Sequence, residues 1–174
     1  MPSKNVSGRE NQQERLKTIG WVVGFIDGEG CFSVSLHKNS TTKLGWQIMP
    51  EFVATQGEKS IKALLKLKDF FDCGNVFINK RHDNHNGNLY RYCVRSFKDL
   101  KKKIIPFFEE NNLQTSKRLD FKIFSEVIKL MDKRMHLNEK GVEKIITLAM
   151  QMNTKKRKNH FENPQRPHAE SAKN

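Results

Sequence analysis

The first strong hydrophobic pattern of the chain begins near Glu14 and runs to Asp27. Its apolar positions are distributed almost all round a helix: Leu16, Ile19, Trp21, Val22, Val23, Phe25 and Ile26. A helix that is apolar on nearly every side belongs in an interior or an interface. Residues 1–13 carry almost no apolar content, so we expect a mobile leader and then a domain that begins at residue 14.

After Gly30 the hydrophobic period changes to two. Phe32, Val34 and Leu36 alternate with polar residues, which predicts a half-buried strand. A second extended run covers residues 46–56, and Pro50 within it indicates an edge position or a bulge. Helical spacing follows from Ile61 to Phe71, and Gly74 is placed to cap that helix.

The second half of the chain has the same order of patterns. Residues 75–81 and 89–96 predict a second hairpin around Asn86-Gly87. Ser96 with Asp99 forms a capping pattern for a helix. Pro106 interrupts or restarts that helix, and Thr115 and Asn138 are placed to cap two later helices.

The order α-β-β-α-β-β-α, followed by helices, predicts an α+β domain whose antiparallel sheet is built from two hairpins. We expect this domain to span residues 14–153. Residues 154–174 include a basic run, and we interpret them as a disordered tail.

Basic residues strongly outnumber acidic ones. The chain has 32 Lys and Arg against 19 Asp and Glu, a formal net charge of +13. Such a charge attracts polyanions and, against DNA, would displace condensed counterions. Charge alone does not separate a nucleic-acid-binding enzyme from a ribosome-associated protein or from a basic protein kept soluble by its charge.

The three cysteines are far apart and have neither zinc-ligand spacing nor the spacing of a disulfide framework. No apolar run reaches the length of a membrane span, and the first residues contain no signal-peptide core. We expect free thiols and an intracellular protein without a membrane partner. Richness in Lys and Asn makes a chloroplast or mitochondrion one candidate compartment.

Gly20, Gly24 and Gly28 are four residues apart and form one smooth stripe on the first helix. Glycine costs about 1 kcal/mol relative to alanine inside a helix, so three on one face indicate a structural reason. Close approach of a second helix is such a reason.

Asp27 and Glu29 lie at the C-terminal end of this helix, where the macrodipole is already negative. Acids there are unfavourable unless a positive charge offsets them, and a divalent cation would do so. Asp-Gly-Glu-Gly would also suit a tight turn with solvated acids. The glycine stripe favours metal binding, because two helices packed along it bring their acids together.

The run Val22-Val23-Gly24-Phe25-Ile26-Asp27-Gly28-Glu29-Gly30 resembles the signature of the LAGLIDADG homing endonucleases. Cys31-Phe32-Ser33 continues as the first strand of that family does, and the αββαββα order is similar. The resemblance implies a nuclease whose sheet binds double-stranded DNA in the major groove.

In that family the last acid of the motif coordinates metal together with a main-chain carbonyl just before it. The resemblance therefore implies Glu29 as ligand, Gly28 as carbonyl donor and Mg²⁺ as cofactor. Phe52-Val53-Ala54-Thr55-Gln56 resembles a strand end with an active-site glutamine, so Gln56 is expected to orient water.

The segment Leu113 to Arg118 resembles one that carries a basic residue near the active site. Lys117 is the expected catalytic residue, with Thr115 as the alternative. An ordinary surface lysine in a first helical turn would give the same pattern.

The sequence contains one copy of the motif, whereas family members with two copies act as monomers. One copy implies a symmetric homodimer. The expected interface residues are Gly20, Trp21, Val23, Gly24 and Asp27.

Alternation along the predicted strands places polar side chains on one face of the sheet, which we expect to contact DNA. Both hairpin turns are rich in hydrogen-bond donors and nearly free of acids. The expected DNA-binding residues are Ser33, Ser35, His37, Lys38, Asn39, Thr41, Thr42, Lys43, Gln47, Lys80, Arg81, His82, His85, Asn86, Asn88, Arg91 and Arg95.

The sequence thus predicts a site-specific homing endonuclease that makes double-strand breaks in a long, partly palindromic site. Two other functions suit the same fold: an RNA-binding maturase that assists intron splicing, and a catalytically silent DNA-binding regulator. Glu29 argues against the silent form, because loss of this acid would leave the fold intact.

Overall fold

The computed structural model describes residues 4–79 and 87–152. The predicted α+β fold and its αββαββα order are confirmed. In chain order the helices and strands are α1 Lys4–Glu29, β1 Gly30–Lys38, β2 Trp46–Gly57, α2 Ile61–Phe71, β3 Asn75–Asn79, β4 Leu89–Val94, α3 Phe97–Asp99, a π-helical segment Leu100–Ile104, α4 Ile105–Glu110, α5 Lys117–Asp132 and α6 Glu139–Gln151.

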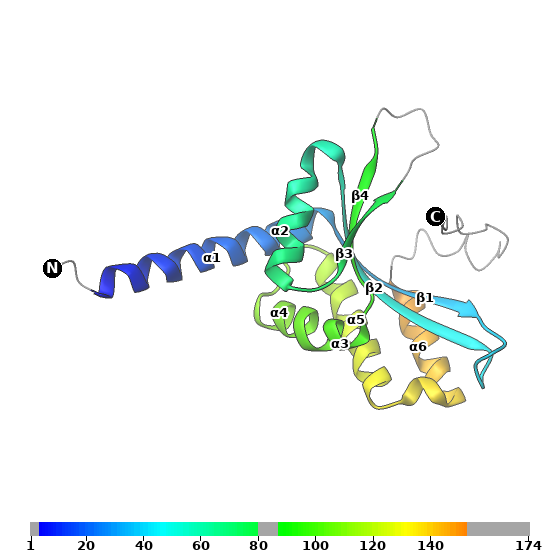
Figure 1. Ribbon diagram of the computed structural model, residues 1–174. Coiled ribbons are helices and arrows are strands. Elements are labelled where there is room, and N and C mark those ends of the chain that lie inside the picture. Colours follow the sequence, from blue (N-terminus) through cyan, green and yellow to red (C-terminus); the bar gives the residue numbers. More distant parts are fainter. Residues whose placement is uncertain (1–3, 80–86, 153–174) are drawn as a thin grey trace.

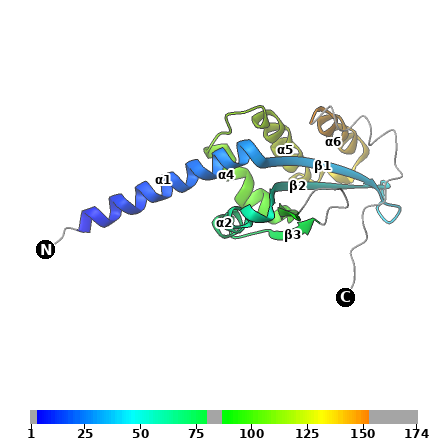
Figure 2. The same cartoon turned by 90° about the horizontal axis from the view of Figure 1, so that it is seen from above.

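The strands form one antiparallel sheet in the order β1-β2-β4-β3, so the second strands of the two hairpins lie side by side. Alternation along β1 and β2 gives the sheet two different faces. Phe32 and Phe52 are buried on one face, whereas Ser35 and Gln47 are exposed on the other. Figures 1 and 2 show the helices beside the sheet and the first half of α1 projecting away from it.

Phenylalanine rings fill the space between the sheet and the helices. The ring of Phe32 lies 5.0 Å from Phe52, 5.5 Å from Phe108 and 5.4 Å from Phe124, between centroids. Phe121 approaches the same ring to 5.2 Å in an edge-on contact. Because these rings come from β1, β2, α4 and α5, one cluster fixes the helices relative to the sheet.

Helix α1 begins at Lys4, well before Glu14, where the apolar pattern starts. It therefore extends through most of the segment expected to be a leader. Glu10 and Gln13 are exposed, so burial does not explain this extension. Glutamate, glutamine and arginine are good helix formers, and propensity continues the helix beyond its packed part.

Two capping predictions are confirmed, and the one for Gly74 is wrong. The Ser96 hydroxyl accepts from the Asp99 N–H at 3.3 Å, and the Asn138 side chain accepts from the Gly141 N–H at 2.9 Å. Gly74, however, is not the cap of α2, because Asp72 already ends that helix with φ 47°. Gly74 is needed for close approach: a Cβ there would lie 2.7 Å from the carbonyl oxygen of Cys93.

Both prolines in regular elements lie where a missing N–H is tolerated. Pro50 pairs with Val34 of β1, and the pairing of β2 with β4 starts only at Phe52. At Pro50 the strand therefore has one neighbour, as the expected edge position requires. Pro106 lies in the first turn of α4, directly after the π-helical segment.

Replacing Phe32 by alanine should lower the free energy of unfolding by about 3–5 kcal/mol, because it removes the ring at the centre of the cluster. Urea unfolding followed by circular dichroism measures the change. Leu119→Ala, at a position 64% exposed on α5, should change it by less than about 0.5 kcal/mol. Equal effects of the two substitutions would contradict this description of the core.

Candidate active site and DNA-binding face

Helix α1 packs one side against the core and leaves the other open. Val22 and Ile26 are fully buried, whereas Gly20, Gly24 and Gly28 are exposed. A Cβ built on any of these three glycines would meet no heavy atom within 4 Å, so nothing in the described residues covers the stripe. Packing among residues 4–79 and 87–152 therefore does not require the glycines.

Aromatic side chains border this open face. Trp21 and Phe25 stack with ring centroids 5.2 Å apart, and the ammonium of Lys66 lies 4.3 Å from the centre of the Trp21 ring. Trp21 and Val23, both expected at the dimer interface, are partly exposed. The surface around the stripe is apolar and already ordered within one chain.

The motif ends in a close turn from helix to strand. A Cβ on Gly30 would lie 2.5 Å from the Ile26 side chain and 2.7 Å from its carbonyl oxygen. Gly30 therefore lets β1 start directly after α1, and its pairing with Ala54 joins the helix end to β2. β1 follows α1 without a loop and continues in the same general direction (Figure 2), which holds Glu29 at the end of the sheet.

Asp27 joins the end of α1 to the start of α5. Its carboxylate accepts from the Gln114 N–H at 2.7 Å, the Thr115 N–H at 3.0 Å and the Thr115 hydroxyl at 2.8 Å. Burial alone would raise the pKa of this carboxyl, but these bonds and the charge of Lys117 hold its pKa below the ordinary value. Asp27, expected at the dimer interface, therefore has its acceptors occupied within its own chain.

Lys117, the first residue of α5, contacts the end of α1 through its ammonium group. The ammonium of Lys117 donates to the carbonyl oxygen of Asp27 at 2.9 Å and to that of Gly28 at 2.5 Å. These are terminal carbonyls of α1, where the macrodipole attracts positive charge. Thr115 does not replace Lys117 here: its hydroxyl donates to Asp27 and accepts from the Lys117 N–H at 3.3 Å. The N-cap position of α5 is Ser116, so the expectation that Thr115 caps this helix is wrong.

Glu29 differs from Asp27 in its surroundings. Its side chain is exposed and has no hydrogen bond or ion pair with another described residue. Gln56 lies at the same end of the sheet, because Gly30 pairs with Ala54, two positions before it. Glu29, the Gly28 carbonyl, Lys117 and Gln56 thus lie at one end of the sheet, where α1 ends.

The described residues contain no group of three or more His, Cys, Asp or Glu side chains placed to hold a metal ion. Glu29 and the Gly28 carbonyl are hard oxygen donors, the type that Mg²⁺ prefers, but they are few. A metal bound here would take its remaining ligands from water, DNA or a second chain.

The expected DNA-binding residues of β1 and β2 share the face opposite the core. Ser33, Ser35, His37 and Gln47 all alternate with buried or half-buried apolar positions. In the first hairpin turn, Asn39 accepts from Thr41 and donates to Gln47, so part of this turn is ordered by its own polar groups. Lys80, Arg81, His82, His85 and Asn86 lie outside the described residues, whereas Asn88 is exposed just before β4.

Arg91 and Arg95 lie on that face, as predicted, but an acid lies between them. Glu51 of β2 accepts from Arg91 Nη2 at 2.5 Å and from Nε of Arg95, and the thiol of Cys93 lies 3.3 Å from the same carboxylate. Burial would raise the pKa of Glu51, but the Arg95 hydrogen bond, the Arg91 charge and the Cys93 thiol hold it below the ordinary value. Burial and the Glu51 charge raise the pKa of Cys93 to about 11.

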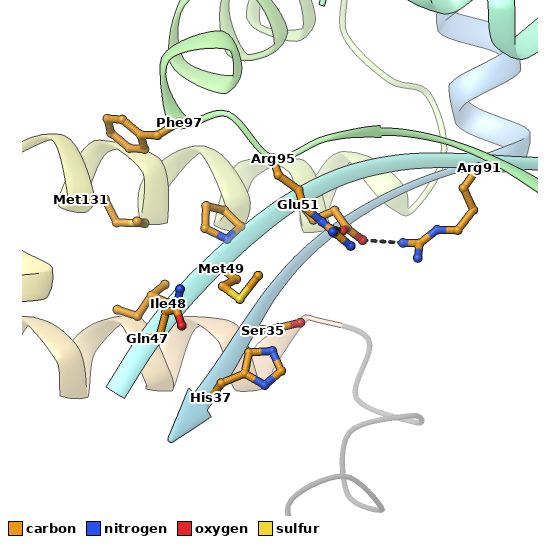
Figure 3. A pocket seen from close by; sticks show the side chains of 11 residues that line it. Ser35, His37, Gln47, Ile48, Met49, Glu51, Arg91, Arg95, Phe97 and Met131 are labelled. Atoms are coloured by element: carbon orange, nitrogen blue, oxygen red, sulfur yellow. Dashed lines mark hydrogen bonds and ion pairs between the residues drawn. The ribbon is translucent and has the colours of Figure 1, made fainter. Parts of the chain in front are cut away.

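Sequence reasoning missed Glu51. The available signal was its alternation with the buried residues Pro50 and Phe52, which places it on the polar face of β2. Glu51, Arg91 and Arg95 line a groove of about 770 Å³ on the sheet (Figure 3). Other residues that line it include Ser35, His37 and Met49.

A family profile described as LAGLIDADG endonuclease matches residues 22–128, more than half of the chain. This chain belongs to the LAGLIDADG endonuclease family. The match begins in the buried part of α1 and ends in α5, so it includes Gly24 and Gly28 of the stripe, the sheet and Lys117.

Relatives within the LAGLIDADG family support the same assignment. The probable intron-encoded endonuclease 3 of Neurospora crassa is 32% identical over 139 residues, which are 79% of this chain and 25% of that protein. The chain therefore spans about a quarter of this curated relative.

Solved structures of LAGLIDADG endonucleases have the same fold. The homing endonuclease I-TnaI is 40% identical with a TM-score of 0.73, over 83% of this chain and 93% of that one. I-SmaMI, bound to an uncleaved DNA target in the presence of calcium ions, is 35% identical with a TM-score of 0.71. That match covers 87% of this chain and 52% of I-SmaMI.

Within residues 4–79 and 87–152, no helix combines the length and the apolar content that a membrane span requires.

Replacing Asp27 by alanine should lower the free energy of unfolding by about 1–3 kcal/mol, the usual effect of leaving hydrogen-bond donors without their charged acceptor. The backbone N–H groups of Gln114 and Thr115 would lose their acceptor, so amide hydrogen exchange at these two residues should accelerate. Glu14→Ala, an exposed acid on the same helix, is the matched control. Unchanged exchange at both amides would contradict the role assigned to Asp27.

Proposed function

We propose that this chain is one subunit of a homodimeric homing endonuclease that makes double-strand breaks in a long, partly palindromic DNA site. The observation that carries the proposal is the meeting of Glu29, the Gly28 carbonyl and Lys117 at the end of a helix whose glycine face is open. Membership of the LAGLIDADG family supports nuclease chemistry at this place.

The dimer follows from the uncovered glycine stripe. Gly20, Gly24 and Gly28 leave room for the backbone of a second α1 at close range, with Trp21 and Val23 beside them. A twofold axis along the stripe brings the same residue from each chain to one place, so the two Glu29 side chains converge. The match to half of DNA-bound I-SmaMI supports a complex of two such units.

We propose that Glu29 and the Gly28 carbonyl hold a divalent cation, with Mg²⁺ as the physiological ion. The chemistry of the donors fits, since both are oxygens and the carbonyls at this helix end already attract the ammonium of Lys117. When bound, a divalent cation supplies Lewis acidity to the phosphodiester and lowers the pKa of water.

The other residues position the reaction. Lys117 places positive charge beside the Gly28 carbonyl and, with DNA present, would stabilise the charge that develops on the scissile phosphate. Gln56 would orient water through its amide, which cannot itself act as a base near neutral pH. Asp27 holds the Thr115–Lys117 segment against α1 and so keeps Lys117 in place.

DNA would lie along the sheet face that carries Ser33, Ser35, His37, Arg91 and Arg95. A two-stranded ribbon fits the major groove, where each base pair has a distinct pattern of donors and acceptors. The excess of positive charge would contribute affinity that weakens as salt rises. By likeness to the intron-encoded relative, we further propose that the gene lies in an organellar intron.

Glu29→Gln should abolish cleavage while DNA binding is retained. The amide keeps the shape of the side chain but not its charge, and loss of the metal should reduce the cleavage rate by at least about a hundredfold. The assay uses Mg²⁺ and a supercoiled plasmid that carries a site selected from a randomised duplex library. Glu14→Gln makes the same charge change far along α1 and should leave the rate unchanged.

Three other outcomes would contradict the proposed chemistry. Metal-dependent cutting by the Glu29→Gln variant would exclude Glu29 as an essential ligand. Tight, selective binding without cutting by the unaltered chain would favour a DNA-binding regulator. Protection of a folded intron RNA, with faster splicing and no DNA cleavage, would favour a maturase.

Gly24→Leu should convert the dimer to a monomer and remove double-strand cleavage, because a leucine on the stripe holds two helices apart. Sedimentation velocity at micromolar concentration measures the oligomeric state. Met150→Ala, at an exposed position on α6 away from the stripe, should leave the dimer intact. A monomeric unaltered chain that still cuts both strands would refute the dimer.

A further inference from the structure

Glu51 is the one acid that the described residues place inside the basic groove of the sheet. Its side chain is 15% exposed, against 34% for Arg91 and 57% for Arg95. Its charge lowers the attraction of this face for DNA, so on electrostatic grounds alone it should weaken binding. A half-buried acid on a surface that must bind a polyanion therefore needs another explanation.

The contacts of Glu51 provide one. Each carboxylate oxygen accepts from a different arginine, Oε1 from Arg91 and Oε2 from Arg95. Arg91 uses one terminal nitrogen and Arg95 uses Nε, so most of the N–H donors of both guanidinium groups remain outside these bonds. Figure 3 shows the carboxylate between the two arginine side chains.

The positions of the three residues follow from strand register. Val53 pairs with Cys93 in the β2–β4 ladder, so Arg95, which follows the end of β4 directly, lies beside Glu51 on the same face. Arg91 lies four residues earlier, within β4. The thiol of Cys93 completes the contacts of the carboxylate from the same strand. Glu51 is thereby anchored from β4 on one side, and it orders two long side chains that would otherwise sample many rotamers.

We propose that Glu51 is a specificity-determining positioning residue. It fixes the orientation of the Arg91 and Arg95 guanidinium groups, so that they can recognise the edges of guanines in the major groove. A guanidinium recognises guanine by two parallel hydrogen bonds to O6 and N7, and this recognition requires a defined plane. A side chain ordered before binding loses less entropy on the correct base, and it cannot adapt to a wrong one. Glu51 reduces non-selective affinity and increases selectivity.

This inference rests on the proposed DNA-binding function, and the experiment separates the two. A randomised duplex DNA library is enriched on the unaltered chain in Ca²⁺. Dissociation constants are then measured for the selected duplex and for a scrambled duplex of the same composition. Their ratio is the discrimination.

Glu51→Gln should reduce the discrimination about tenfold, because ordering of two arginines contributes to recognition of two bases. Binding of the scrambled duplex should be unchanged or tighter, since a negative charge has been removed. Glu143→Gln makes the same charge change at an exposed position on α6 and should leave the discrimination unchanged.

Arg91→Lys and Arg95→Lys provide a second test that does not depend on the folding of the Glu51 variant. Each substitution keeps the positive charge but removes the planar guanidinium group. Discrimination between the selected and the scrambled duplex should therefore fall, while binding of the scrambled duplex stays the same. If Glu51 acts through the arginines, adding Glu51→Gln to the double lysine variant should cause no further loss.

Two results would overturn the inference alone: Glu51→Gln with unchanged discrimination, or lysine variants with unchanged discrimination. An unaltered chain that binds duplex DNA but enriches no sequence would overturn both the inference and the proposed site-specific function. Urea unfolding of each variant establishes that the compared proteins are folded.

Discussion

The interaction on which the site depends is a reciprocal set of hydrogen bonds between the end of α1 and the segment that leads into α5. Asp27 provides a carboxylate to the free N–H groups of Gln114 and Thr115, and Lys117 returns its ammonium to the carbonyls of Asp27 and Gly28. Each charge is placed at the helix end whose macrodipole attracts it. Two segments almost 90 residues apart are thereby locked together.

This interaction separates the roles of the two acids of the motif. The charge of Asp27 is stabilised by hydrogen bonds within its own chain, so it needs no metal to offset its position at a helix C-terminus. Glu29 is exposed and has no partner among the described residues, which leaves it available as a ligand. In the proposed dimer, Asp27 would position Lys117 and Glu29 would be the carboxylate that binds the metal ion.

The sequence predicted those features of the structure that depend on residues close together in the chain. The αββαββα order, the caps at Ser96 and Asn138, and the exposed faces of β1 and β2 all follow from periodicity and capping residues. The partner of Asp27 did not follow, because its contact with Thr115 depends on how distant helices pack. Glu51 was missed for the same reason: its place between Arg91 and Arg95 is set by the register of β2 against β4.

The central claim is that two α1 helices pack along their glycine stripes, and a cysteine at Gly24 tests it most directly. Helices in such close contact bring the two Cα atoms within about 7 Å, the range in which a disulfide forms without backbone movement. In a chain that also carries Cys31→Ser, oxidation of Gly24→Cys should give a covalent dimer that still binds the selected DNA. Glu143→Cys should give none. A Gly24→Cys chain that stays uncrosslinked under the same oxidation, at a concentration where the reduced chain cuts both strands, would contradict the account.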